Sequence, residues 1–197
     1  MINLNKIIYH QTNTWPSYKE LSTEPNIVIA DFIEKIYIQG VFKEINRLMT
    51  SKEYPNCSGV GHIVLIGICS AIDSLSAYTS GGGKVGNRFT GFITKYFPNK
   101  YYGKENLIYD AFRCDGVHGW NLHKSVISGI PNDPKHLEVK FDIAYISLYD
   151  FFNDLMKSFD KFYNELKTDD ILKNNVLKRY KEIRVTVDKI KDQVFIG

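Results

Sequence analysis

Cysteine is scarce in this sequence, and its few copies do not pair. Cys57, Cys69 and Cys114 are odd in number and lack the paired spacing of a disulfide framework. Cys69 also lies in an apolar helical pattern, so free thiols in a reducing compartment are the simplest interpretation. The cysteine content therefore predicts a cytoplasmic protein.

The sequence also lacks a strong excess of charge of either sign. Lysine and arginine number 25 against 22 aspartates and glutamates, which gives a formal net charge of +3. This balance does not demand nucleic acid as a partner, although it permits RNA where the positive residues cluster.

No stretch has the length and apolarity of a membrane anchor. Residues 60–72 are strongly apolar but too short to span a bilayer, they contain His62, and Asp73 follows them. Residues 1–10 lack the apolar core and the small-residue cleavage site of a signal peptide. The run at 60–72 is therefore predicted to be a buried helix, and no membrane contact is expected.

Motifs for metal and cofactor chemistry are missing as well. Cys114, His118 and His123 do not have the spacing of paired zinc ligands. Residues 80–87 are rich in glycine, but they lack the glycine spacing, the Ser or Thr after Lys84 and the preceding strand of a phosphate-binding loop. We therefore expect no metal and no cofactor, and a flexible connection between helices at 80–87.

What the sequence does contain is a large apolar fraction with a mostly helical period. Of its 197 residues 44% are hydrophobic, which is enough for a single domain over 1–197 with its own core. The expected fold class is mainly α, an up-and-down bundle of about five to six helices, preceded by an irregular arm at 1–24. The helices are predicted over about 25–49, 58–79, 88–97, from 104 onward, 145–166, and after a cap at 168–170.

One region changes to a period of two. Apolar and polar residues alternate from 122 to 127 and again from 136 to 143, and residues 129–134 between them are dense in turn-forming types. This pattern predicts a two-stranded β-hairpin inserted at 120–143. One of its faces should pack on the helical bundle, because an isolated hairpin is barely stable.

Residues 107–120 form the strongest candidate for a functional site. They carry Arg113, His118 and two glycines, Gly116 and Gly119, at the end of an apolar-periodic segment. Arg113 and His118 are five positions apart and would diverge by about 140° on a regular helix. To converge on one substrate they need either a helix that loosens near Gly116 or a second copy of the chain that supplies the other half.

Arg113 and His118, preceded by the run LIYDAF at 107–112, resemble the Arg-x4-6-His signature of the HEPN superfamily. Residues 68–75 and 88–97 are similar to the preceding helices of uncharacterised bacterial HEPN-like proteins, and the resemblance covers roughly residues 58–166. It implies a metal-independent endoribonuclease that acts as a toxin or in antiviral defence, and a homodimer in which the motif helices meet. The implied partners are RNA or a nucleotide and an antitoxin-like protein.

The chemistry of the pair fits that activity. A neutral His118 imidazole can take the proton of a ribose 2′-hydroxyl, while the Arg113 guanidinium holds phosphate oxygens. The resemblance also implies an acidic residue near the pair, here Asp73, whose carboxylate among apolar residues needs a partner to offset its desolvation. The plain alternatives are that Asp73 bonds a backbone group or faces solvent, that Arg113 pairs with Asp110 or Asp115, and that His118 caps a carbonyl.

Cys114 departs from the family pattern. It directly follows the arginine, where catalytic HEPN motifs usually have Asn, Asp or His, and a thiol is a poor hydrogen-bonding substitute. The alternative function is therefore a catalytically silent nucleotide-binding or protein-interaction module. Arg88, Lys84 and Lys95 are candidates for a basic stripe that contacts an RNA backbone, although a solvated helix face is the plainer interpretation.

Overall fold

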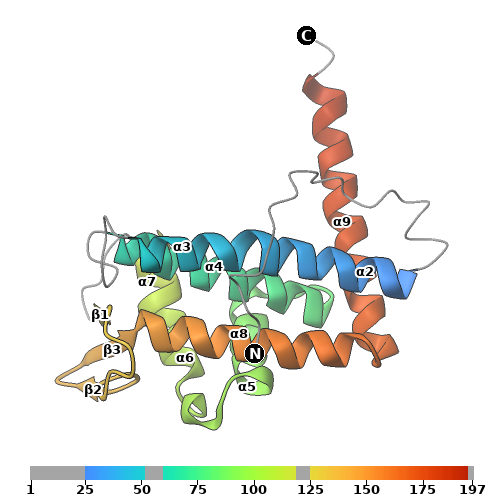
Figure 1. Ribbon diagram of the computed structural model, residues 1–197. Helices are drawn as coiled ribbons and strands as arrows, with labels where there is room; N and C mark the ends of the chain where they lie inside the picture. Colours follow the sequence, from blue (N-terminus) through green and yellow to red (C-terminus); the bar gives the residue numbers. More distant parts are fainter. Residues whose placement is uncertain (1–24, 52–59, 119–124, 195–197) are drawn as a thin grey trace.

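The computed structural model describes residues 25–51, 60–118 and 125–194. Within these ranges the protein is mainly α-helical with a small β insertion, as the sequence predicts (Figure 1). The predicted arm at 1–24 lies outside the described residues.

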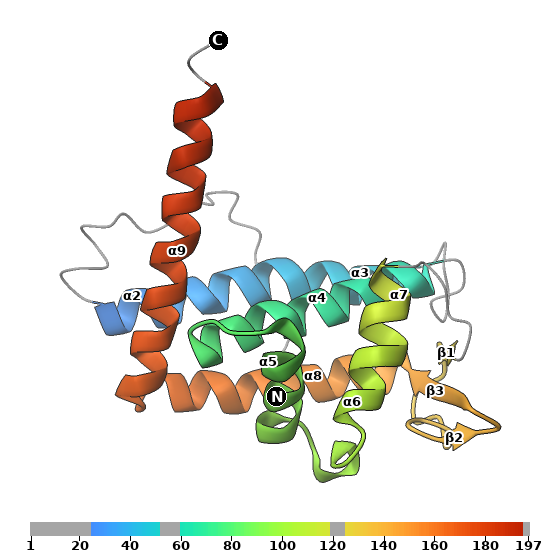
Figure 2. The same cartoon turned by 180° about the vertical axis from the view of Figure 1, so that it is seen from behind.

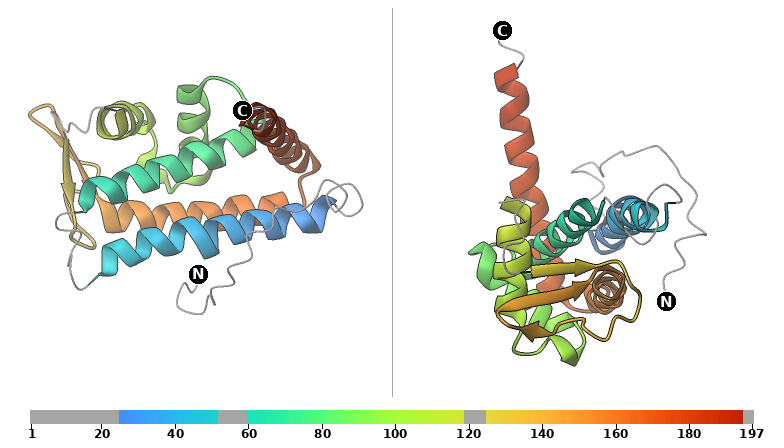
Figure 3. Two further views of the ribbon diagram at one scale, coloured as in Figure 1. Left: turned by 90° about the horizontal axis from the view of Figure 1, so that it is seen from above. Right: turned by 90° about the vertical axis from the view of Figure 1, so that its left-hand side faces the viewer.

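Three long helical rods form the body of the protein. The first is a continuous helix made of α2 (Pro25–Glu34), the π-helical segment η2 (Lys35–Val41) and α3 (Phe42–Thr50). The other two are α4 (Gly61–Ser80) and α8 (Leu148–Leu166), and all three lie roughly parallel in Figure 3. Both α4 and α8 begin at the end of the molecule that carries the sheet, so the rods do not simply alternate up and down.

The helix α4 is central because it is apolar on nearly every side. Its residues Val64, Leu65, Ile68 and Ile72 are completely buried. At 20 residues, α4 is longer than the apolar run at 60–72, which by itself is too short to span a bilayer. By length and composition alone it could cross a membrane, but a buried core helix passes the same test, and just over half of its apolar stretch is buried inside the protein.

The motif helix, defined here as residues 105–118, crosses the three rods steeply (Figure 2). It comprises α6 (Glu105–Leu107), the π-helical segment η5 (Ile108–Cys114) and α7 (Asp115–His118). The preceding helix α5 (Val85–Tyr96) packs against it.

Close approach of α5 to the motif helix depends on a glycine. A Cβ atom added to Gly86 would lie 3.2 Å from the ring of Tyr109, which is tighter than ordinary contact. The rings of Phe89 and Tyr109 also pack against each other with centroids 5.4 Å apart. The small residue and the aromatic pair together fix where the motif helix lies.

The last helix, α9 (Asp170–Val194), begins at the predicted cap. The Asp169 carboxylate accepts hydrogen bonds from the backbone N–H groups of Ile171 and Leu172 at 2.8 and 3.0 Å. The first half of α9 packs on α4, α2 and α8, and its second half extends away from the bundle (Figure 1).

A glycine holds α9 against the end of α4. Gly81 ends α4 in the left-handed conformation with a φ of +63°, and a Cβ atom there would lie 2.9 Å from the Asn175 side chain. The Asn175 amide donates to the Thr79 carbonyl at 2.8 Å and so satisfies a backbone group of the last turn of α4. This junction fixes the part of α9 that faces α4.

Phenylalanine fills the space between the rods. Phe42 and Phe159 meet edge to face with centroids 5.2 Å apart, which joins the first rod to α8. The buried apolar residues form one hydrophobic cluster. Its completely buried phenylalanines are Phe42, Phe89, Phe92, Phe112, Phe151, Phe152, Phe159 and Phe162.

The β insertion is a three-stranded sheet, so the simple hairpin predicted at 120–143 is wrong. The strands β1 (Ser125–Ser128), β2 (Val139–Lys140) and β3 (Ile143–Ser147) have the spatial order β1-β3-β2. The pairing of β1 with β3 is parallel, and β2 pairs antiparallel with β3. Phe141 and Asp142 form a tight turn with φ of +52° and +61°. This turn pairs β2 with β3, the strand that follows it, and not with β1.

A polar network joins the sheet to α8. The Ser147 backbone N–H donates to His136 Nδ1 at 3.2 Å, and His136 Nε2 lies 3.0 Å from the Tyr101 hydroxyl oxygen. That hydroxyl donates to Asp154 Oδ2 at 3.2 Å, and Lys100 Nζ lies 2.6 Å from the same oxygen. One neutral tautomer of His136, protonated on Nε2, satisfies all of these contacts.

Candidate functional site

The motif helix does loosen, but before Gly116. In η5 the Asp115 backbone N–H donates to the Asp110 carbonyl five residues earlier, so this turn is wider than an α-helical turn. Gly116 itself is buried inside α7 with helical geometry, so the loosened part of the helix ends two residues before it. Arg113 lies within the wide turn, whereas His118 is the last residue of α7.

Arg113 meets the acidic residue that the sequence analysis selected. Asp73 Oδ2 accepts from Arg113 Nε at 2.9 Å and lies 2.8 Å from Arg113 Nη2. Both side chains are mostly buried, with 14% of Arg113 and 21% of Asp73 exposed. The carboxylate of α4 thus has the partner that its desolvation requires, and that partner comes from the motif helix.

Electrostatics favour the charged form of this arginine. Burial alone would lower the pKa of the Arg113 guanidinium, but the hydrogen bond and the negative charge of Asp73 outweigh burial and raise it. The Arg113 Cζ atom also lies 5.6 Å from the centroid of the Tyr109 ring, in a cation–π arrangement. The guanidinium is therefore a fixed positive charge held between α4 and the motif helix.

Cys114 lies in this polar cluster. Its half-buried side chain is within hydrogen-bonding reach of both Tyr109 and Arg113. Burial and this thiol together raise the pKa of Tyr109, so the phenol remains protonated at neutral pH. The thiol thus occupies the place beside the arginine where HEPN motifs usually have a stronger polar group.

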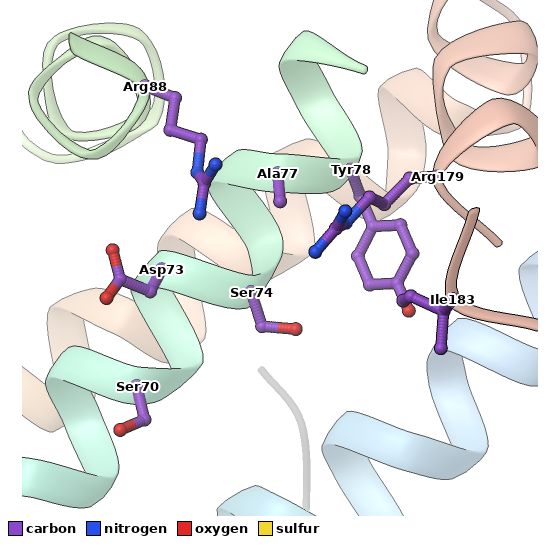
Figure 4. A pocket seen from close by; sticks show the side chains of 8 residues that line it. All are labelled: Ser70, Asp73, Ser74, Ala77, Tyr78, Arg88, Arg179 and Ile183. Atoms are coloured by element: carbon purple, nitrogen blue, oxygen red, sulfur yellow. The ribbon is translucent and has the colours of Figure 1, made fainter. Parts of the chain in front are cut away.

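A pocket of about 260 Å³ adjoins Asp73. Five residues of α4 form its floor, one arginine comes from α5, and α9 contributes a second arginine and an isoleucine. In Figure 4 the guanidinium groups of Arg88 and Arg179 both reach over the face of α4 that carries Asp73 and Ser74. The lining residues are Ser70, Asp73, Ser74, Ala77, Tyr78, Arg88, Arg179 and Ile183.

Several polar atoms at the pocket are only partly satisfied. Asp73 Oδ1 and Arg88 Nε are buried, and neither has a hydrogen-bond partner within the described part of the chain. Arg88 Nη1 donates to the Gly83 carbonyl at 3.0 Å, and Arg179 Nη1 donates to Glu182 at 3.1 Å. A buried acceptor and a buried donor without partners are costly, so this pocket is prepared for a polar ligand.

Ser74 and Tyr78 are two uncharged residues of the pocket lining. The Ser74 hydroxyl accepts a hydrogen bond from Tyr37 at 2.6 Å, which leaves its own hydrogen for another acceptor. Burial raises the pKa of Tyr78 to about 12, although the charge of Arg179 acts in the opposite direction. Tyr78, Ala77 and Ile183 therefore offer neutral surface in the pocket lining, and Ala77 lies between the two arginines in Figure 4.

The predicted basic stripe is only partly at this site. Arg88 lines the pocket, but Lys95 Nζ lies 2.6 Å from Glu165 on α8 and is not among the lining residues. Lys84 is the exposed residue that precedes α5. Of the predicted catalytic residues, Arg113 and Asp73 are in direct contact, and the side chain of His118 lies outside the described part of the structure.

Sequence reasoning missed Arg179. The polar side of the last helix is rich in lysine with interspersed acids, a composition typical of a solvated face. No signal in the sequence singles it out, because Asn175, one helical turn before Arg179, meets Gly81 only in the folded chain. Within the described residues no group of three or more His, Cys, Asp or Glu side chains could hold a metal ion.

Comparison of this chain with protein-family models, curated proteins and solved structures finds no match. The resemblance to the HEPN superfamily therefore rests on the residues at 68–75, 88–97 and 107–118 and remains a prediction.

Proposed function

We propose that this protein is a metal-independent endoribonuclease of the HEPN type, with a role as a toxin or in antiviral defence. The observation that carries the proposal is the ion pair between Arg113 and Asp73. The motif arginine is held by an acidic residue of the central helix, which is the arrangement that the resemblance implies. The pair adjoins a pocket with two further arginines, and together these groups favour a phosphate-bearing substrate.

In the proposed reaction His118 removes the proton of a ribose 2′-hydroxyl, and the 2′-oxygen attacks the adjacent phosphorus. The bond from phosphorus to the 5′-oxygen breaks, the leaving oxygen takes up a proton from water, and His118 returns its own proton to the solvent. The products are a 2′,3′-cyclic phosphate and a 5′-hydroxyl end. Arg113 stabilises the charge on the phosphoryl oxygens, and Asp73 positions Arg113.

A homodimer through the motif helices is part of the proposal. The wide turn at η5 ends at Cys114, and α7 continues as an ordinary helix to His118. A two-fold pairing of motif helices would place Arg113 of one protomer near His118 of the other and build one cleft from two half-sites. Light scattering at micromolar concentration tests this, and a strict monomer would remove the composite site. The further partner proposed is an antitoxin-like protein that blocks the cleft.

The deciding assay is cleavage of varied RNAs in excess chelator. The natural protein is compared with His118→Ala and Arg113→Ala, and with Arg47→Ala as a control for the loss of one exposed arginine on α3. We expect each motif substitution to slow cleavage by about two to four orders of magnitude, because each removes a proton acceptor or a transition-state charge partner. Cleavage that persists unchanged in both motif variants would refute the assignment.

A catalytically silent nucleotide-binding or protein-interaction module is the second candidate. Two observations favour it, namely Cys114 in place of a polar residue and the use of both Nε and Nη2 of Arg113 by Asp73. If the intact protein leaves RNA uncut while it binds a nucleotide or a partner chain, this candidate replaces the enzyme.

A further inference from the structure

The pocket beside Asp73 combines two kinds of hydrogen-bonding partner in a small space. Arg88 and Arg179 offer positively charged donors from two different helices, and Asp73 Oδ1 offers a buried acceptor that has no partner among the described residues. An anion without a hydrogen atom, such as sulfate, would satisfy the arginines but would leave the carboxylate oxygen without a donor. The ligand that satisfies both carries an anionic group and a hydroxyl close together.

The charge of the site limits that anion. Arg88, Arg113 and Arg179 are three positive groups, and the carboxylates bonded to two of them, Asp73 and Glu182, are two negative groups. The pocket and its ion partners therefore have an excess of one positive charge. A phosphodiester matches this excess, and a terminal phosphate matches it when it keeps one proton.

The size of the pocket limits the rest of the ligand. Its volume of about 260 Å³ is below the range of about 300–1,000 Å³ that encloses drug-sized molecules. A ribose with one phosphate is a fragment of suitable size, and Ala77, which lies between Asp73 and Arg179 in Figure 4, supplies apolar surface for the sugar carbons. A base attached to that ribose would project from the pocket.

We propose that this pocket binds one ribose-phosphate unit and selects RNA over DNA. Arg88 and Arg179 bind the phosphate oxygens, and Asp73 Oδ1 accepts a hydrogen bond from the ribose 2′-hydroxyl. Asp73 is thus a specificity-determining residue, because Arg113 occupies its Oδ2 while its Oδ1 has no partner among the described residues and is left for the sugar. The inference rests on the proposed function in its substrate class, but it concerns binding and not cleavage.

Mononucleotides that cannot be cleaved test the proposal directly. Isothermal titration measures the binding of adenosine 3′-monophosphate, of its 2′-deoxy analogue and of its 2′-O-methyl analogue to the full chain. We expect the ribonucleotide to bind about tenfold more tightly than either analogue, because neither analogue can donate a hydrogen bond from the 2′ position. Inorganic phosphate alone should bind more weakly than all three.

Substitutions then locate the site. Arg88→Gln and Arg179→Gln should each weaken binding of the ribonucleotide and of its deoxy analogue by about tenfold or more, whereas the control Arg47→Gln should leave both unchanged. Asp73→Asn should reduce the preference for the ribonucleotide with little effect on the deoxy analogue. Thermal unfolding of each variant shows whether the fold is retained, and the ligand series on the natural protein remains decisive if Asp73→Asn is unstable.

Equal affinity for the ribonucleotide and its deoxy analogue would overturn the role of Asp73. Unchanged binding in Arg88→Gln and Arg179→Gln, or no binding at millimolar nucleotide, would overturn the pocket. Selective binding without RNA cleavage would sustain this inference and refute the proposed enzyme. If the protein binds no mononucleotide but cleaves RNA equally well with Arg88→Gln and with Arg179→Gln, this inference is refuted and the proposed enzyme is sustained.

Discussion

Acid should destabilise this protein through the half-buried imidazole of His136. Burial, followed by the positive charge of Lys100, lowers the pKa of His136 from 6.5 to about 4. Its Nδ1 accepts the Ser147 backbone N–H, and a proton on Nδ1 would remove that hydrogen bond. The folded protein therefore keeps this imidazole neutral between pH 6.5 and 4, whereas the unfolded chain protonates it.

The sign and size of the effect follow from linkage. The unfolded state binds more protons in this window, so the stability due to neutral His136 is complete above pH 6.5 and is lost as the pH falls toward 4. For these two pKa values the loss between pH 7 and 5 is about 2 kcal/mol. Because His136 is only half-buried, solvent screening reduces the expected value to about 1 kcal/mol. In a chain of this size that corresponds to a fall in Tm of about 2–4 °C.

The assay is urea unfolding followed by circular dichroism at pH 7, 6 and 5. The matched variant is His136→Gln, which cannot titrate in this range. It should be less stable than the natural protein at pH 7, but its free energy of unfolding should fall by about 1 kcal/mol less between pH 7 and 5. Equal losses in the two proteins, or a pKa above 6 for His136 by nuclear magnetic resonance, would refute the reasoning.

Three further substitutions have defined outcomes. Gly81→Ala should lower the free energy of unfolding by about 1–2 kcal/mol in a urea titration, because it forces a side chain to a φ of +63° and toward Asn175. The control is Gly91→Ala on α5, where a Cβ atom meets open space. It should be neutral or slightly stabilising in the same titration. A double-mutant cycle of Asp73→Ala and Arg113→Ala should give a coupling energy of about 1–3 kcal/mol, and a value near zero would mean that this ion pair contributes nothing to stability. Cys114→Asn should raise the rate of RNA cleavage, since it restores a polar side chain beside Arg113; a lower rate in a folded variant would show that the thiol does not limit activity.

Much of the fold could be predicted because helices are local. The apolar spacing in the first rod, in α4 and in α8 depends on residues three and four apart, and these helices lie where the pattern places them. The cap at Asp169 is also local, since its carboxylate bonds backbone groups only two and three residues away. The choice of Asp73 as an anomaly needed only its apolar neighbours in the sequence.

The start of α8 could not be predicted from the local sequence pattern. Residues 145–147 continue an apolar helical stripe, yet they form the end of β3 because β1 pairs with that segment. The helix α8 begins only after Ser147, whose side chain caps it by accepting a hydrogen bond from the Asp150 N–H at 3.1 Å. A strand partner that lies some twenty residues away leaves no trace in the local period. The exact place of the wide turn could not be predicted from the sequence either, since η5 itself contains no glycine or proline.

The sequence by itself determined that the chain is mainly helical, that α4 is its apolar centre, and that a carboxylate on α4 needs a partner. Only the tertiary structure decided that this partner is Arg113 and that Arg88 and Arg179 line one pocket together with Asp73. The physical reason is that a charged residue on a helix surface looks the same in sequence whether water or another helix faces it. The packing of α5 and α9 on α4, with Gly81 allowing the close approach of α9, turns two such residues into the walls of one pocket.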